Sequence, residues 1–227
     1  MKPLFLILLT FFLLTYSSIA SITETNLSPL QIPVVFIGDP GNQGDCGIGG
    51  RGLGAVAAPF YLGKYEITAE EFCPFLNAVA SKTDTHGLYH PGMTLDTNVA
   101  CLTCTLLADS TYNYTPISGR EKIPVTYVSL HTAKRYCNWL GNGCPSLANG
   151  DEEATVEAST EKGAYTFSQR GNQVVSTFDP GATNAEGMLY YIPTETEWIK
   201  AGYYAGNVTK SGYSGYPTRK DIAPDNG

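Results

Sequence analysis

The sequence is poor in charge, and above all in positive charge. Charged residues make up 15% of the 227 residues, with 14 basic against 21 acidic side chains and a formal net charge of −7. A protein that binds nucleic acid needs a basic stripe to neutralise phosphates, and an anionic membrane surface attracts clusters of lysine and arginine. The composition therefore argues against a nucleic-acid-binding protein and against simple adsorption to a membrane.

Residues and motifs typical of hydrolases, metal centres and phosphate loops are also scarce. The histidines are only three, His86, His90 and His131. The first two are four residues apart, but a glycine and a proline nearby disfavour the helix that would align them as metal ligands. No Gly-x-Ser-x-Gly elbow occurs, and the glycine-rich segment 38–54 lacks the Gly-Lys-Ser/Thr of a phosphate loop. From the residues alone we assign no catalytic, cofactor-binding or metal-binding residue.

Only one long apolar run is present, and it lies at the N-terminus. Lys2 precedes an apolar stretch over residues 4–14, and Ser18 and Ala20 stand at the −3 and −1 positions of a cut after residue 20. The run is shorter than the roughly 20 apolar residues of a membrane span. This pattern predicts a signal peptide over residues 1–20 and a secreted, periplasmic or extracellular protein, with no membrane span after its removal. An uncleaved N-terminal anchor is the alternative.

Six cysteines lie after the predicted leader. An even number in a secreted chain suggests disulfides, although six cysteines allow 15 pairings and free thiols are the alternative. The only Cys-x-x-Cys lacks the second pair that a zinc ribbon needs and the βαβ context of a redox motif. The six are Cys46, Cys73, Cys101, Cys104, Cys137 and Cys144.

Capping signals predict three helices. Thr68 with Glu71, and Thr194 with Glu197, form capping boxes, and Ser129 is a candidate cap for a helix that ends at Gly-Asn-Gly 141–143. Pro74 lies beyond the first turn of the first helix, so that helix is expected to be kinked or to start later. His131 falls in the first turn of the second helix, where we expect a surface or capping role.

The remaining segments read as strands and loops. We expect strands over residues 34–37, 60–65 and 189–192, and a hairpin over 164–175. Residues 82–120 are expected to form a long loop region with short strands. Residues 145–163, with the acidic triplet 151–153, are expected to form an exposed loop, because the spacing is not that of an EF-hand. The tyrosines of the tail (Tyr203, Tyr204, Tyr213 and Tyr216) are expected to fill the core, with a recognition surface as the alternative.

Three blocks in this order resemble the formylglycine-generating enzyme, or sulfatase-modifying factor, family. The first is FYLGKYEIT at 60–68 with FLNAV at 75–79, which is similar to the family's strand ending in K-x-E-V-T and the helix after it. The second is PVTYVSLHTAKRYCNWL at 124–140, and the third is IPTETEW at 192–198, which resembles L-P-T-E-A-E-W. The resemblance covers roughly residues 32–223.

The resemblance implies a compact α+β fold of the C-type-lectin-like kind. We expect a loop-rich domain with short antiparallel strands and about three helices over residues 32–227, after a polar lead-in at 21–31. Trp139 and Trp198 are expected to be large core anchors.

The sequence departs from the family pattern in two blocks. Leu130, His131 and Thr132 follow Ser129, so the family's Trp and Asp are replaced there, and Tyr191 stands at the place of an arginine. These changes fit a divergent secreted subgroup.

The resemblance also bears on catalysis. In the family, a cysteine pair in the C-terminal half binds copper and activates oxygen, and that half carries structural calcium sites. No match to that half precedes Gly227, so none of the six cysteines is carried over as catalytic, and copper and calcium are expected only for a complete family enzyme. Cys137 matches a cysteine that serves structure in enzyme members, where its partner would lie beyond this end.

Two functions follow as hypotheses. The first is a secreted binding or pseudoenzyme module whose partner is an unknown protein or glycan. The second is the N-terminal part of a copper-dependent oxidase that converts a cysteine of a sulfatase-type polypeptide to formylglycine. The departures favour the first, since a family carries its fold further than its chemistry.

Overall fold

The computed structural model describes residues 24–27, 30–45, 52–206 and 212–217. Within these ranges the chain forms five α-helices, one 3₁₀ turn and seven short strands joined by long loops. The predicted leader over residues 1–20 and Cys46 lie outside the described residues. No helix in the described ranges is long and apolar enough to cross a membrane. The elements are β1 Glu24–Leu27, β2 Ile32–Ile37, β3 Phe60–Gly63, α1 Ala69–Val79, α2 Gly92–Leu95, β4 Leu102–Leu106, β5 Tyr112–Pro116, α3 Leu130–Gly141, η1 Leu147–Asn149, α4 Glu153–Glu161, β6 Tyr165–Arg170, β7 Gln173–Phe178 and α5 Glu195–Tyr203.

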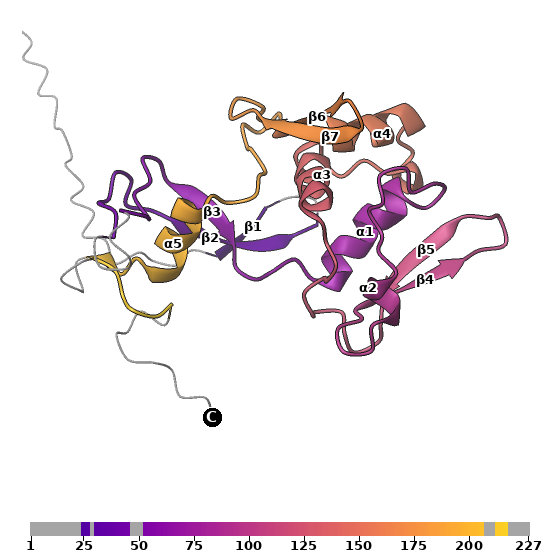
Figure 1. Ribbon diagram of the computed structural model, residues 1–227, viewed down its shortest axis with the longest axis horizontal. Helices are drawn as coiled ribbons and strands as arrows, with labels where there is room; N and C mark the ends of the chain where they lie inside the picture. The colour runs from indigo at the N-terminus through magenta and orange to yellow at the C-terminus, as the bar shows by residue number, and fades with distance from the viewer. Residues whose placement is uncertain (1–23, 28–29, 46–51, 207–211, 218–227) are drawn as a thin grey trace, which may run out of the picture.

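All strand pairs are antiparallel and belong to three small sheets. One sheet has the order β1-β2-β3, and β4-β5 and β6-β7 are two-stranded. The three-stranded sheet lies near α5, while α1 to α4 and the two hairpins form the other part of the molecule (Figure 1). The expected α+β class with short antiparallel strands is therefore present. β1 falls in the stretch that was expected to be a polar lead-in, and it pairs with β2 from Glu24 opposite Val35 to Leu27 opposite Ile32.

Helix α1 begins where the sequence predicts. The Thr68 backbone N–H donates to Glu71 Oε2 at 2.8 Å, and the Glu71 N–H donates back to Thr68 Oγ1 at 3.4 Å. This reciprocal box satisfies two N–H groups that a helix start leaves unpaired. Pro74 lies inside the helix, which begins at Ala69 and runs to Val79, so the expected later start was wrong, while the expected kink stays a prediction.

Helix α3 provides the second half of the core. The Ser129 hydroxyl caps it by accepting from the Thr132 N–H at 3.1 Å, and the helix ends at Gly141 as predicted. Trp139 is 1% exposed, and its indole N–H donates to the Pro145 carbonyl at 3.0 Å, which satisfies its polar edge. The prediction that Trp139 is a core anchor is confirmed.

Four rings from α1 and α3 meet at the centre of this core. The centroid of Phe75 lies 5.3 Å from those of Phe72 and Tyr136 and 5.4 Å from that of Trp139. Tilted and edge-on aromatic pairs at such distances add to the energy of apolar burial. The packing of α1 on α3 therefore rests on Phe75.

Several expectations for the segments between these helices were wrong. Residues 145–163 are not an exposed loop, because α4 forms there even though Val156 is its only buried apolar side chain. Residues 82–120 contain the short strands that were expected, β4 and β5, and also the one-turn helix α2, which was not. Residues 189–192 form no strand; the Ile192 N–H donates to the Tyr165 hydroxyl at 3.0 Å rather than to a neighbouring strand. The helix count therefore rises from about three to five.

Helix α5 docks through a lysine rather than through its tryptophan. Trp198 is 53% exposed, so its expected role as a core anchor was wrong. Lys200 is 1% exposed and donates to the Asp39 carbonyl at 2.7 Å, and the Tyr204 hydroxyl bonds to the Asp39 carboxylate. The buried Lys200 ammonium therefore hydrogen-bonds to the 38–45 loop, and the Trp198 indole lies on the exposed side of the helix.

Of the four tyrosines of the tail that were expected to fill the core, only Tyr213 is buried, and none belongs to the main core cluster. Tyr213 is buried and accepts a hydrogen bond from the Asn42 amide at 2.8 Å, while its own hydroxyl donates to the Gln43 carbonyl at 3.1 Å. Tyr203 and Tyr204 are partly buried, and Tyr216 remains 38% exposed. These rings serve mainly to hold the tail on the 38–45 loop.

Replacing Phe75 by alanine tests the account of the core. Phe75 is fully buried, so Phe75→Ala is expected to lower the free energy of unfolding by about 3–5 kcal/mol through lost burial and cavity formation. Leu106→Ala is the matched control, because Leu106 is 62% exposed and its loss is expected to cost within about 0.5 kcal/mol. Urea denaturation measures both; equal effects of the two changes would contradict the assignment of the core.

Candidate functional site

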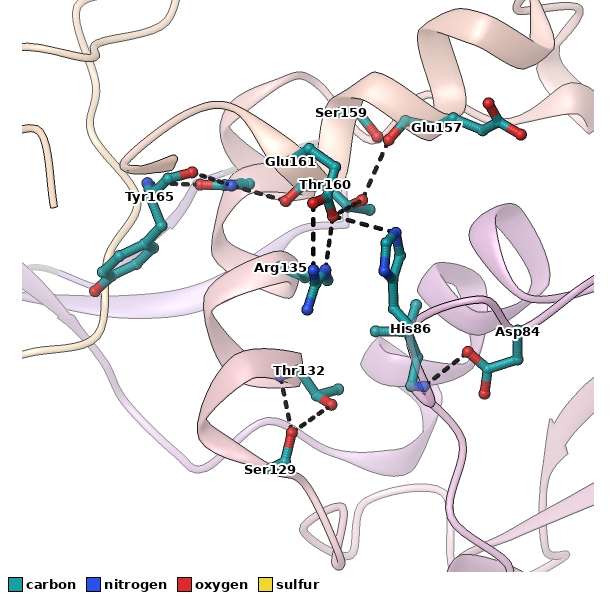
Figure 2. Close-up of polar contacts among 12 residues, drawn as sticks. Asp84, His86, Ser129, Thr132, Arg135, Glu157, Ser159, Thr160, Glu161 and Tyr165 are labelled. Atoms are coloured by element: carbon teal, nitrogen blue, oxygen red, sulfur yellow. Dashed lines mark hydrogen bonds and ion pairs between the residues drawn. The ribbon is translucent and has the colours of Figure 1, made fainter. Parts of the chain in front are cut away.

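An ion pair between the buried Arg135 of α3 and the partly exposed Glu161 of α4 is the centre of the candidate site. The Arg135 side chain is 4% exposed, and its Nε and Nη2 donate to Oε1 and Oε2 of Glu161 at 2.7 and 3.2 Å (Figure 2). Glu161 is the last residue of α4, so the carboxylate comes from the end of a helix that the sequence pattern did not predict. Two parallel N–H···O bonds make this a strong, geometrically specific pair.

An aromatic ring covers the guanidinium on another side. The Arg135 guanidinium carbon lies 4.0 Å from the ring centroid of Phe167 on β6, and the His131 ring meets the same phenyl group edge-on at 5.9 Å. The cation thus exchanges water for a carboxylate and a π face, an arrangement that the planar guanidinium group favours. His131 is partly buried and packs on Phe167, while Ser129 caps the helix, so the expected surface or capping role was wrong.

His86 approaches the same carboxylate from the loop after α1. Its Nε2 lies 3.3 Å from Glu161 Oε1, and both side chains are about one-third exposed (Figure 2). Burial and the Arg135 charge lower the pKa of His86, and they outweigh the opposite effect of Glu161. For Glu161, burial alone would raise the pKa, but the hydrogen bonds and charge of Arg135 hold it below its usual value. Glu161 is thus ionised and His86 mainly neutral near pH 7.

The hydroxyl groups around this pair have partners of their own. Ser159 Oγ donates to the Val156 carbonyl at 2.6 Å, and Thr160 Oγ1 bonds to Glu161 Oε1 at 3.0 Å. Ser129 is occupied as the cap of α3. No hydrolytic Ser-His-acid set is therefore assembled among these residues, and the chemistry that the cluster supports is proton binding by His86.

The three histidines are not brought together. His90 Nδ1 accepts from the Gly92 N–H at 3.0 Å, and its ring stacks on Tyr127 at 4.7 Å, away from the ion pair of His86. Across the described ranges, no group of three or more His, Cys, Asp or Glu side chains could hold a metal ion.

Burial makes most of the described thiols weakly acidic. It raises the pKa of Cys137 and Cys144 to about 12, and burial together with the nearby Cys101 does the same for Cys73. Burial also raises the pKa of Cys104. The thiolate is the nucleophilic and metal-binding form of cysteine, so none of these four thiols is activated.

The disulfides expected from the even cysteine count are not seen among the five described cysteines, which are all free. Cys46 lies outside the described residues. The alternative of free thiols holds for these five side chains.

Removing the acidic partner tests the buried pair. Glu161→Gln leaves the Arg135 cation in a dehydrated site without its counter-charge, so the free energy of unfolding is expected to fall by about 3 kcal/mol. Glu153→Gln breaks the exposed pair with Lys82, whose side chains are 52% and 58% exposed, and is expected to cost no more than about 1 kcal/mol. Urea denaturation of both variants measures this difference, and a Glu161→Gln effect as small as the control would contradict the role of the pair.

The pH dependence of stability tests His86. Because its pKa is lowered by folding, the unfolded chain takes up this proton at a higher pH than the folded chain. Its stabilising contribution is therefore complete above the unfolded pKa of about 6.5 and is lost as the pH falls. The unfolding free energy of the wild type should drop more between about pH 7 and about pH 5 than that of His86→Asn. Parallel pH curves for the two proteins would show that His86 is not coupled to folding.

Comparison with known families identifies a match over most of the chain. The family described as "Sulfatase-modifying factor enzyme 1-like domain" matches residues 54–226. That range includes α1, α3 and α5 with their caps, and the Arg135–Glu161 pair. No curated protein and no solved structure shows a significant match to the chain. On the family match, which covers most of its length, the chain belongs to the sulfatase-modifying factor family.

Proposed function

We propose that this chain is a secreted binding module, or pseudoenzyme, that uses the family scaffold to recognise a protein or glycan. The observation that carries the proposal is an exposed aromatic pair on the β1-β2-β3 sheet. Phe36 and Tyr61 stand opposite each other on β2 and β3, their ring centroids are 5.3 Å apart, and they are 37% and 51% exposed. Tyr65, just beyond β3, is 65% exposed.

The chemistry of this aromatic face suits recognition. Aromatic rings give large contact areas at low entropic cost and stack on apolar faces of sugars or side chains. The Lys64 ammonium lies 5.1 Å above the Tyr65 ring, which adds a cation at the edge of the face. Single exposed apolar residues are common on proteins, but neighbouring exposed apolar side chains that form one patch often mark an interaction site.

The described thiols add no activated nucleophile to the proposed module. Thiol oxidases require an accessible, activated cysteine, whereas burial raises the pKa of Cys73, Cys137 and Cys144. The C-type-lectin-like fold and the signal peptide over residues 1–20 belong to the same proposal, and the loop-rich α+β arrangement and the leader-like sequence support them.

The family match favours a second candidate function. A match over residues 54–226 is also what the N-terminal part of a formylglycine-generating oxidase would give. In that case the partner is a sulfatase-type polypeptide, and the oxidation of its cysteine requires copper and oxygen.

Substitution of the aromatic pair tests the binding module. The protein is applied to an array of glycans and to a displayed peptide library, and the double variant Phe36→Ser/Tyr61→Ser is expected to lose the signals of the wild type. Tyr112→Ser is the matched control, because Tyr112 is 41% exposed on the β4-β5 hairpin and its loss should leave the signals unchanged. Equal loss in both variants, or no loss in either, would argue against this face.

A direct assay tests the oxidase. The purified product of the whole reading frame is incubated with a sulfatase-type cysteine peptide, copper, oxygen and a thiol reductant, and the peptide is examined by mass spectrometry. The binding module is expected to leave the peptide cysteine intact. Formation of formylglycine that depends on the protein would instead establish the oxidase.

A further inference from the structure

A half-open pocket of about 180 Å³ lies between the end of α3, the start of β6 and the loop after β7. Its polar and aromatic lining comes from Cys137, Asn142, Lys162, Thr183, Asn184 and Tyr190, and its other lining residues are glycine and alanine. The small residues leave the hollow open. The pocket is separate from the aromatic pair on β2 and β3 and from the Arg135–Glu161 pair, which contribute no residue to it.

Two asparagines build its walls and each leaves one group unused. The Asn142 amide N–H₂ donates to the carbonyls of Asn138, Ser159 and Lys162 at 2.9, 2.9 and 2.8 Å, which joins α3 to the end of α4. In the opposite wall, Asn184 Oδ1 accepts from the N–H groups of Glu186 and Met188. Each side chain is thereby fixed, while within the described ranges the Asn142 Oδ1 acceptor and the Asn184 N–H₂ donor have no hydrogen-bond partner.

The pocket lining carries a positive charge and several hydrogen-bond donors. Lys162 carries the only formal charge there, and within the described ranges no acidic side chain pairs with its ammonium or lines the pocket. Thr183 and Asn184 add hydroxyl and amide donors. The Cys137 thiol stays neutral, since burial raises its pKa to about 12. Such a set matches an anion, because hydrogen bonds from charged donors to carboxylates are among the strongest that proteins make.

The volume restricts the ligand to a compact one. An apolar cavity of about 150 Å³ in another protein accommodates one benzene ring, so about 180 Å³ suits a single ring or a short chain with one acidic group. We propose that this pocket is a binding site for a small organic carboxylate, held by Lys162 with Asn184 and Thr183. This site goes beyond the proposed recognition of a protein or glycan by the aromatic face and does not depend on it.

Titration with benzoate tests the site. Amide chemical shifts of the full protein are followed by NMR, and the expected result is a saturable shift confined to the segments around Asn142, Lys162 and Asn184. Lys162→Gln is expected to weaken benzoate binding about tenfold, because it removes the charged donor. Lys82→Gln is the matched control, since Lys82 is an exposed lysine outside this lining, and it should bind like the wild type.

A neutral probe separates charge recognition from general apolar binding. Benzamide has nearly the shape of benzoate without its charge, and it is expected to bind at least about tenfold more weakly. Equal affinity for the two probes, an unchanged affinity in Lys162→Gln, or the absence of benzoate-induced shifts at the pocket would each overturn the proposal. A thermal melt of Lys162→Gln that matches the wild type confirms that any loss arises in a folded protein.

Discussion

The pair of buried Arg135 and partly buried Glu161 is the contact that joins the separate segments of the helical part of the molecule. A guanidinium without water needs a carboxylate partner, and Glu161 supplies both oxygens at 2.7 and 3.2 Å. To place that carboxylate, α4 must end beside the middle of α3. The same geometry brings the His86 imidazole and the Phe167 ring onto the pair. The Arg135–Glu161 pair therefore joins α3 to α4, and its contacts with Phe167 and His86 add β6 and the loop after α1.

Buried asparagines complete what the ion pair begins. Asn138 donates to the carbonyls of Thr160 and Tyr165 at 2.8 and 2.6 Å and accepts from the Tyr165 N–H at 2.9 Å. Asn77 makes the same two-way contact with the Tyr114 backbone at 2.8 Å. Irregular segments carry backbone groups that no helix or sheet satisfies, and burial demands a partner for each. Side-chain amides can thus hold a loop-rich domain together where regular ladders are short.

The sequence predicted those parts of the fold whose signals are local. The capping box at Thr68 and the cap at Ser129 lie within three residues of their partners, and the α1 and α3 faces repeat at helical spacing. The sequence did not predict helix α4, because its contacts are with α3 and its own pattern has a single buried apolar residue, Val156. His86 and Glu161 are 75 positions apart in the sequence, so no local pattern predicts their contact. Trp198 was misplaced because a family motif does not say which face of a helix is buried.

The proposed functions place recognition on the exposed aromatic face and in the small pocket, while burial keeps the thiols of Cys73, Cys137 and Cys144 protonated and unreactive. The most direct test of this account is the alkylation rate of each cysteine in the folded protein, resolved by mass spectrometry of its peptides and compared with the urea-unfolded chain. The account predicts that Cys73, Cys137 and Cys144, whose pKa values burial raises to about 12, react far more slowly when folded at neutral pH. Faster alkylation of any of the three in the folded protein would reveal an activated thiol and contradict the account.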